Sequence, residues 1–329
     1  MAASERRAAG GGPAALAVAE RHDRGVAALP VGLTRGRIGV ADLDAVLALS
    51  DGAGWNQTAD DWALFCARGS VVGCRDGSGR VVATAAALPY EAALSGAAAP
   101  DHRPAGAMAP GWISMVLVTP LWQHRGVAGA LLDDVIALLE QQRRTPWLDA
   151  TPAGAPVYRR RGFGSGFGFE RWQAARPRPD GATQPAGAPA PRLARVDADL
   201  DAIAALDAAA SAIGRRFLLA DFVARRATRA WLAADGSGCS VARAGRRALQ
   251  IGPLVAADYG AAVALLDAAL AQADGAVHID VPTQQTTFAA ALQQRGFTRQ
   301  RPFVRMALGA LPPEQADGRL YAVAGPEFG

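Results

Sequence analysis

A short polar stretch between a strand-like run and a helix-like run carries the clearest chemistry in this sequence. The β-like residues 112–118 are followed by Thr119-Pro120-Leu121-Trp122 and then by Gln123-His124-Arg125-Gly126-Val127-Ala128, where an apolar helix begins. The first N–H groups of a helix have no partner inside it, and the helix dipole favours an anion in front of them. Gly126 and Ala128 carry little or no side chain, so a bulky diphosphate can approach the backbone. The spacing therefore predicts a diphosphate-binding loop.

A tyrosine further along the chain is a candidate proton donor. Tyr158 lies in a short predicted helix, after Leu148-Asp149-Ala150-Thr151-Pro152 and before Gly162-Phe163. A phenol has an ordinary pKa of about 10, close to that of a thiol, so it can protonate a departing thiolate. The alternative is a ring that packs in the core while its hydroxyl contacts water or backbone.

The pattern Gln-x-x-Gly-x-Ala after a strand resembles the acetyl-coenzyme A pyrophosphate loop of the GNAT acyltransferase superfamily. The segment from Leu148 to Phe163 resembles the closing strand, helix and hairpin of the same family. A Rossmann-like turn is the alternative, but no Gly-x-Gly-x-x-Gly fingerprint precedes Asp149. The resemblance implies that Tyr158 is the general acid. It also implies that the donor is bound by Met115, Val116, Leu117, Val118, Gln123, His124, Arg125, Gly126, Val127 and Ala128.

The resemblance leaves the general base open. Many relatives place an acid on the strand that corresponds to 112–118, where this chain has Ser114. An ordered water, Asp61 or Glu91 are alternatives. His102, on a loop rich in proline, glycine and alanine that could cover the site, is a further candidate.

Four residues between the first two predicted helices are candidates for binding the acceptor. Trp55, Asn56, Gln57 and Trp62 lie where GNAT enzymes usually admit that substrate, and aromatic rings beside an amide suit a small polar ligand. A helix cap at Asn56 or Thr58 with two core tryptophans explains the same residues equally well.

The elements that must position these residues divide into two parts. A Pro/Gly/Ala-rich linker at 174–191 separates a catalytic domain, 30–173, from a second domain, 192–312, with tails at 1–29 and 313–329. Hydrophobic periodicity in the first domain predicts helices at 41–50 and 61–66, strands at 70–75, 80–88 and 112–118, a helix at 127–141, a strand at 147–150, a helix at 156–161 and a strand at 167–173.

The second part repeats the end of the first. Strand-like 250–255, a helix at 262–272 and a strand at 277–282 precede a second Gly-Phe pair at 296–297. The loop glutamine becomes Ala257 and the tyrosine becomes Leu292, so the second domain loses the polar groups. We expect an α/β (α+β) fold of two tandem GNAT-like domains, each a mixed, mostly antiparallel sheet flanked by helices. The chain resembles bacterial tandem GNAT proteins that have a C-terminal acetyltransferase-like domain.

Composition narrows the possible partners. The net charge is +4, and the arginine pairs are scattered without interleaved aromatic residues, which argues against a nucleic-acid surface. No apolar run is long enough to cross a bilayer. The three cysteines, Cys66, Cys74 and Cys239, have no metal-site spacing. The N-terminal apolar stretch is too short for a signal peptide, so we expect a cytoplasmic protein. We also expect a monomer or a homodimer, and no bound metal.

The resemblance implies an N-acyltransferase that moves an acetyl group from acetyl-CoA to the amine of a small molecule, by direct attack in a ternary complex. A catalytically silent CoA-binding sensor is the alternative, because the strand lacks an acid and the second domain is degenerate.

Overall fold

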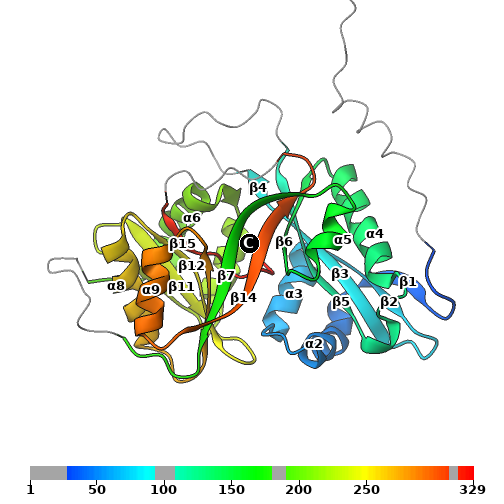
Figure 1. Cartoon of the computed structure of the whole chain (residues 1–329), viewed down its shortest axis with the longest axis horizontal. Coiled ribbons are helices and arrows are strands. Elements are labelled where there is room, and N and C mark those ends of the chain that lie inside the picture. Colours follow the sequence, from blue (N-terminus) through cyan, green and yellow to red (C-terminus); the bar gives the residue numbers. More distant parts are fainter. Residues whose placement is uncertain (1–27, 93–107, 180–189, 311–317) are drawn as a thin grey trace, which may run out of the picture.

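The computed structural model describes residues 28–92, 108–179, 190–310 and 318–329. Thirteen of the described strands form one sheet that runs through both halves of the chain, and β4 and β9 form a separate pair. The strands β7 (Gly164–Ala174) and β14 (Thr298–Ala307) lie side by side at the centre in Figure 1. Most strand pairs are antiparallel, and helices flank the sheet. The predicted mixed α/β architecture is confirmed, and the two domains share one sheet.

The first half follows the predicted order of elements, with β1 and β4 added. Thr58 caps α3 through its hydroxyl, which accepts from the Asp61 N–H, while the Asp61 carboxylate accepts from the Thr58 N–H. The elements are β1 (Thr34–Ile38), α2 (Leu43–Gly52), α3 (Ala59–Arg68), β2 (Ser70–Arg75), β3 (Val81–Pro89), β4 (Glu91–Ala92), β5 (Pro110–Val118), α4 (Val127–Gln141), β6 (Thr145–Ala150), α5 (Ala155–Arg159) and β7.

The second half repeats the strand–helix–strand–helix–strand unit that follows β3. Its β12, α8, β13, α9 and β14 correspond to β5, α4, β6, α5 and β7 of the first half. The elements are β8 (Arg192–Leu193), α6 (Val196–Ser211), β9 (Ile213–Gly214), α7 (Arg216–Ala224), β10 (Arg229–Leu232), β11 (Gly238–Arg243), β12 (Leu249–Ala256), α8 (Tyr259–Leu270), β13 (Val277–Pro282), α9 (Thr286–Gln294), β14 and β15 (Leu320–Ala322).

The last strands of the two halves are exchanged. The order across the centre of the sheet is β6-β14-β7-β13, so β14 pairs with β6 of the first half and β7 pairs with β13 of the second. The sequence predicts separate domains on either side of the linker at 174–191. In the structure each half instead completes the sheet of the other, because the equivalent strands β7 and β14 have each crossed over.

Two buried ion pairs hold the exchanged strands in register. Arg305 on β14 binds Asp149 on β6 through two hydrogen bonds of 2.9 Å. Arg171 on β7 binds Asp280 on β13 in the same two-pronged way, at 2.9 and 2.8 Å. The two arginines occupy equivalent positions in the internal repeat, and so do the two aspartates. The repeat therefore produces a pseudo-symmetric pair of charge contacts across the exchange.

A second equivalent pair of contacts fixes the helices within each half. Arg161, after α5, binds Asp133 on α4, with Nε–Oδ1 at 2.6 Å. Arg295, after α9, binds Asp267 on α8 at the same distance. The internal repeat therefore includes these two arginine–aspartate ion pairs, which the sequence analysis did not identify.

Alternate residues of β3 face two different cores. Ala83, Ala85 and Ala87 pack with α4 and α5, whereas Ala86 and Leu88 belong to a core that also contains residues of α2, α3, α6 and α7. A third core lies between the second half of the sheet and α8 and α9. The core shared by α2, α3, α6 and α7 joins the two halves by apolar contact.

The segment after residue 317 is not the tail that the sequence predicts. β15 pairs with β12, and Phe328 has no exposed surface. The Tyr90 hydroxyl donates to the Phe328 carbonyl at 2.9 Å, and the Arg215 guanidinium donates to the same carbonyl at 2.7 Å. The apolar residues from Leu320 to Ala324 explain the difference, because they bury well beside the shared core. Residues 1–27 of the other predicted tail lie outside the described part of the chain.

Within the described ranges, no helix combines the length and apolar character that crossing a membrane requires. The same residues contain no group of His, Cys, Asp and Glu side chains suited to a metal ion.

Candidate functional site

The strands β5 and β6 separate where the sequence predicts the donor. They pair in parallel only over Pro110–Trp112 and Thr145–Trp147. Beyond Trp112, β5 continues to Val118 next to β3, while β6 continues beside β14. Among the described residues, one edge of β5 therefore has no neighbouring strand from about residue 113 onward.

A β-bulge decides which backbone groups of β5 face this open edge. Ala86 is opposite Ser114, but the next pair on this ladder is Thr84 with Leu117, so Met115 and Val116 share a single partner position. Met115 has a φ of 53°, in the left-handed region that side chains other than glycine rarely adopt. In a regular strand, every second residue directs its N–H and C=O toward the neighbouring strand. The bulge shifts this pattern on β5 by one residue after Ser114.

Beyond the bulge, alternate residues present their backbone groups to the open edge. The Thr119 N–H donates to the Val82 carbonyl on β3 at 2.8 Å, so odd-numbered residues here face β3. Val116 and Val118 consequently face the other way. The Val118 carbonyl agrees with this, because it accepts from the Gln123 side-chain amide at 2.9 Å and not from β3. By the same alternation, we infer that the N–H and C=O of Val116 face the open edge of β5 and not β3.

The predicted loop ends in a helix whose N-terminus has no cap of its own. Gly126 is the N-cap of α4 with φ 82°, it gives no side-chain cap, and the first turn contains no acidic residue. A Cβ built on Gly126 would meet nothing within 4 Å. The first N–H groups of α4 therefore have no side-chain cap among the described residues, and the positive end of the helix dipole lies at the same point.

The side chains of the loop surround this helix end. Gln123 closes the loop onto the end of β5 through its bond to the Val118 carbonyl. His124, with φ 60°, and Arg125 are exposed, and the Arg125 guanidinium lies 5.2 Å from the centre of the Trp122 ring.

The equivalent helix of the second half is closed. Asp258 is the N-cap of α8, and its carboxylate accepts from the Ala261 N–H at 2.9 Å. This carboxylate occupies a free N–H group and places a negative charge where an anion would bind. The sequence predicted that this half lacks the polar loop residue, and the structure adds a physical reason for poor anion binding.

Tyr158 lies on α5, which follows β6, and is half-buried against the core formed with α4. Its ring packs edge-on against Phe163, with 5.8 Å between the ring centres. Burial raises the pKa of Tyr158 to about 12. The hydroxyl makes no hydrogen bond within the described residues and is not among their buried unpartnered atoms. A phenol in this state is protonated at neutral pH and has its proton to donate.

Two of the four predicted acceptor-binding residues make other contacts. Trp62 has no exposed surface and donates from Nε1 to the Ser50 hydroxyl at 3.1 Å. Asn56 accepts from the Arg247 and Ala248 N–H groups and donates to the Ala248 carbonyl, at 2.9 to 3.0 Å. Trp62 thus packs in the core, and Asn56 ties the first half to the turn between β11 and β12. The sequence left these alternatives open.

The other two predicted acceptor-binding residues are not fully used by contacts within the protein. One has a partly exposed ring, and the other has a side-chain oxygen without a hydrogen bond in the described part of the chain. Trp55 is half-buried against the shared core. Gln57 is 6% exposed, and its Oε1 atom has no hydrogen-bond partner within the described residues. Both follow α2 in the loop that leads to α3.

The candidates for a general base are dispersed. Asp61 caps α3 and accepts from Arg225 Nη1 at 2.6 Å. Glu91 is exposed on β4, which pairs with β9 of the second half. Ser114 is 9% exposed and lies at the bulge, next to the open edge. His102 lies outside the described residues.

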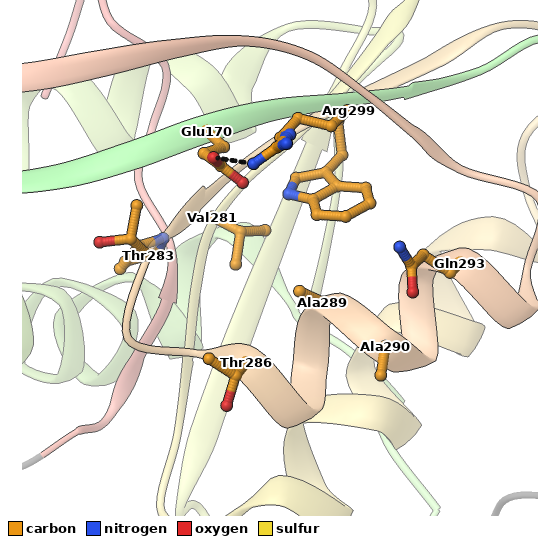
Figure 2. Close-up of a pocket in the computed structure, with 10 residues that line it drawn as sticks. Glu170, Val281, Thr283, Thr286, Ala289, Ala290, Gln293 and Arg299 are labelled. Atoms are coloured by element: carbon orange, nitrogen blue, oxygen red, sulfur yellow. Dashed lines mark hydrogen bonds and ion pairs between the residues drawn. The ribbon is translucent and has the colours of Figure 1, made fainter.

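A cavity of about 350 Å³ is lined by residues of β7, β13, α9 and β14 (Figure 2). Its lining contains Val281, Thr283, Ala289 and Gln293 from β13, α9 and the turn between them, and the ion pair of Glu170 with Arg299 at 2.8 Å spans one side. It contains no residue of the loop at 123–128.

Sequence reasoning missed Thr84, whose hydroxyl donates to the Met115 carbonyl at 2.8 Å. The available signal was a single polar residue within the run Val-Val-Ala-Thr-Ala-Ala-Ala-Leu at 81–88. It also missed the contact of Arg305 with Asp149, because nothing in a linear sequence pairs two residues on exchanged strands.

Two models of acetyltransferase (GNAT) domains match the chain. One covers residues 39–166 and the other covers 203–322, so together they account for more than half of the sequence. No curated protein matches it.

Solved structures share the whole two-part architecture. A candidate acetyltransferase from Pyrococcus horikoshii is 16% identical with a TM-score of 0.73, over 94% of this chain and all (100%) of that one. A tandem GNAT protein from the clavulanic acid biosynthesis pathway is 16% identical with a TM-score of 0.58, over 85% and 99% of the two chains. A GCN5-related N-acetyltransferase from Kribbella flavida is 20% identical with a TM-score of 0.52, over 84% and 70%. At these identities the likeness establishes the fold.

Proposed function

Because this chain belongs to the GNAT acetyltransferase family, we propose that it moves an acetyl group from acetyl-CoA to the amine of a small molecule. One observation carries the proposal: the uncapped N-terminus of α4 lies next to the unpaired edge of β5. The helix end suits the diphosphate of the donor, and the edge supplies backbone partners for the amides of its pantetheine arm.

The proposed reaction is direct transfer in a ternary complex. The amine nitrogen attacks the thioester carbonyl carbon, a C–N bond forms, and the C–S bond breaks. The Val116 N–H donates to the carbonyl oxygen as negative charge develops there. Tyr158 protonates the departing thiolate, and the nitrogen loses its proton to water or to a base reached through water. Ser114 is the polar side chain of β5 nearest the bulge and is our choice to orient that water.

We propose that the acceptor enters on the side of the loop between α2 and α3. Trp55 and Gln57 keep a half-buried ring and an unpartnered oxygen there, which suit a small ligand with an apolar part and a hydrogen-bond donor. Of the four residues that the sequence predicts, Trp62 and Asn56 support this region through packing and tethering.

Acetyl-CoA binding is the first test. We expect titration calorimetry to give one acetyl-CoA per chain, because α4 has an uncapped end and α8 is capped by Asp258. Incubation with a panel of small amines is then expected to release free thiol with at least one of them. Absence of acetyl-CoA binding would overturn the proposal, and two equivalents bound would overturn the distinction between the halves.

A CoA-binding sensor without turnover is the second candidate. The absence of a carboxylate on β5, where Ser114 stands, favours it. This function requires tight binding of acetyl-CoA and no thiol release with any amine. Release of thiol that depends on the added amine excludes it.

Tyr158→Phe tests the proton donor. We expect kcat to fall roughly 100-fold with little change in the KM for acetyl-CoA, because the ring packing is kept and only the proton is lost. The pKa of Tyr158, raised to about 12, also predicts no loss of activity from its ionisation between pH 7 and pH 10. Tyr259→Phe on α8 is the matched control and should leave kcat unchanged. An unchanged kcat in Tyr158→Phe removes this residue from the mechanism.

A further inference from the structure

The bulge in β5 is an unfavourable backbone conformation that other contacts must maintain. Met115 is not glycine, yet its φ is 53°, in the left-handed region that is unfavourable for a residue with a Cβ. Its side chain is 1% exposed, so the residue is fixed in the core and not free to relax. Strain of this kind persists only where the surroundings select the conformation.

Thr84 on β3 supplies a contact that selects it. The Thr84 side chain has no exposed surface, and its hydroxyl donates to the Met115 carbonyl at 2.8 Å. Because the bulge moves this carbonyl off the regular ladder between β3 and β5, a side-chain donor satisfies it. Losing the donor would leave a buried carbonyl unpaired.

The Met115 carbonyl and the Val116 N–H belong to one planar trans peptide, so they point in opposite directions. A hydroxyl that holds the carbonyl toward β3 therefore turns the N–H toward the open edge of β5. This is the N–H assigned to the thioester oxygen. Thr84 thus lies behind the peptide, on the opposite side from the donor.

We propose that Thr84 is a positioning residue for acetyl transfer: its hydroxyl fixes the Met115–Val116 peptide so that the Val116 N–H polarises the thioester carbonyl. The inference rests on the proposed function. The effect of Thr84 is indirect, because its side chain contacts neither the donor nor the acceptor. It stabilises the transition state more than it strengthens binding, because negative charge on the carbonyl oxygen grows as the amine attacks.

Thr84→Val removes the hydroxyl and keeps the shape of the side chain. We expect kcat to fall about 10- to 100-fold, as for a misaligned oxyanion donor, with the KM for acetyl-CoA changed less than about twofold. Thr84→Ser, which keeps the donor, should retain most of the activity, and Thr84→Ala should lose it. The Ser–Ala pair repeats the hydroxyl comparison if the valine variant folds poorly. Thr228→Val is the matched control, since its buried hydroxyl has no partner within the described residues.

A spectroscopic measurement separates this inference from the proposed function. In wild-type protein, binding should lower the infrared stretching frequency of the acetyl-CoA thioester carbonyl, without any acceptor present. Thr84→Val and Thr84→Ala should show a smaller shift than wild type and Thr84→Ser. An equal shift in all of them would overturn the role of Thr84 and leave the proposed function standing. Failure of wild-type protein to bind acetyl-CoA, or to shift the band, would overturn both.

Discussion

An aspartate at position 128 is expected to weaken acetyl-CoA binding more than 100-fold while leaving the fold intact. Ala128 lies in the first turn of α4, which has no acidic residue and no side-chain cap. A carboxylate about 5 Å from one charge of a diphosphate, at an effective dielectric constant of about 20, costs about 3 kcal/mol. The same carboxylate interacts favourably with the helix dipole, so the free protein should be no less stable. Titration calorimetry and thermal unfolding measure the two effects separately.

Gly260→Asp provides the matched control for this variant. Gly260 occupies the same position in α8 as Ala128 does in α4, and α8 begins with Asp258. A carboxylate there should leave acetyl-CoA affinity within about twofold, because no donor binds at that helix. Wild-type affinity in Ala128→Asp would show that the diphosphate binds elsewhere. A loss in both variants would point to a general effect of added negative charge.

The largest stability effect is expected at the ion pair between the exchanged strands. Asp149→Asn should lower the free energy of unfolding by about 3–5 kcal/mol, because Arg305 would remain charged with its partner removed. The two side chains are 0% and 1% exposed, and the guanidinium lies 4.8 Å from the centre of the Trp112 ring. Chemical denaturation at neutral pH measures the change.

Two comparisons identify burial of charge as the cause. Arg299→Gln breaks the ion pair with Glu170, in which the arginine side chain is 64% exposed, and should cost no more than about 1 kcal/mol. Replacing both buried partners, Asp149→Leu with Arg305→Met, should recover most of the loss, since a well-packed apolar pair avoids the desolvation cost. A loss of less than 1 kcal/mol in Asp149→Asn would contradict this account of the exchange.

The exchanged sheet shows why tertiary pairing escapes sequence reasoning. Arg171 and Arg305 occupy equivalent positions of the repeat, as do Asp149 and Asp280. Each arginine is chemically suited to either aspartate, so the sequence is compatible with both pairings. Alternation along a strand predicts which face a residue lies on, and it carries no information about the neighbouring strand.

The acceptor side of the candidate site was ambiguous for a related reason. Trp62 and Asn56 have the residue types of a ligand site, yet one fills the core and the other binds the turn at Arg247 and Ala248. An indole or an amide makes the same contacts with protein as with a small molecule. Only the tertiary structure, which places the second half of the chain beside these residues, shows whether they contact the protein or a ligand.

The sequence by itself determined the local structures of this protein. Hydrophobic periodicity and turn residues predicted α4 at 127–141 and β2 at 70–75 with the bounds observed, and the small residues of the loop predicted its turn into a helix. These features depend on neighbouring residues, and neighbours are read directly from the chain. The tertiary structure decided the long-range features: the exchange of β7 and β14, the burial of Phe328, the open edge of β5, and the bulge held by Thr84. Each of these depends on which distant segment lies alongside, and that is set by the packing of the whole chain.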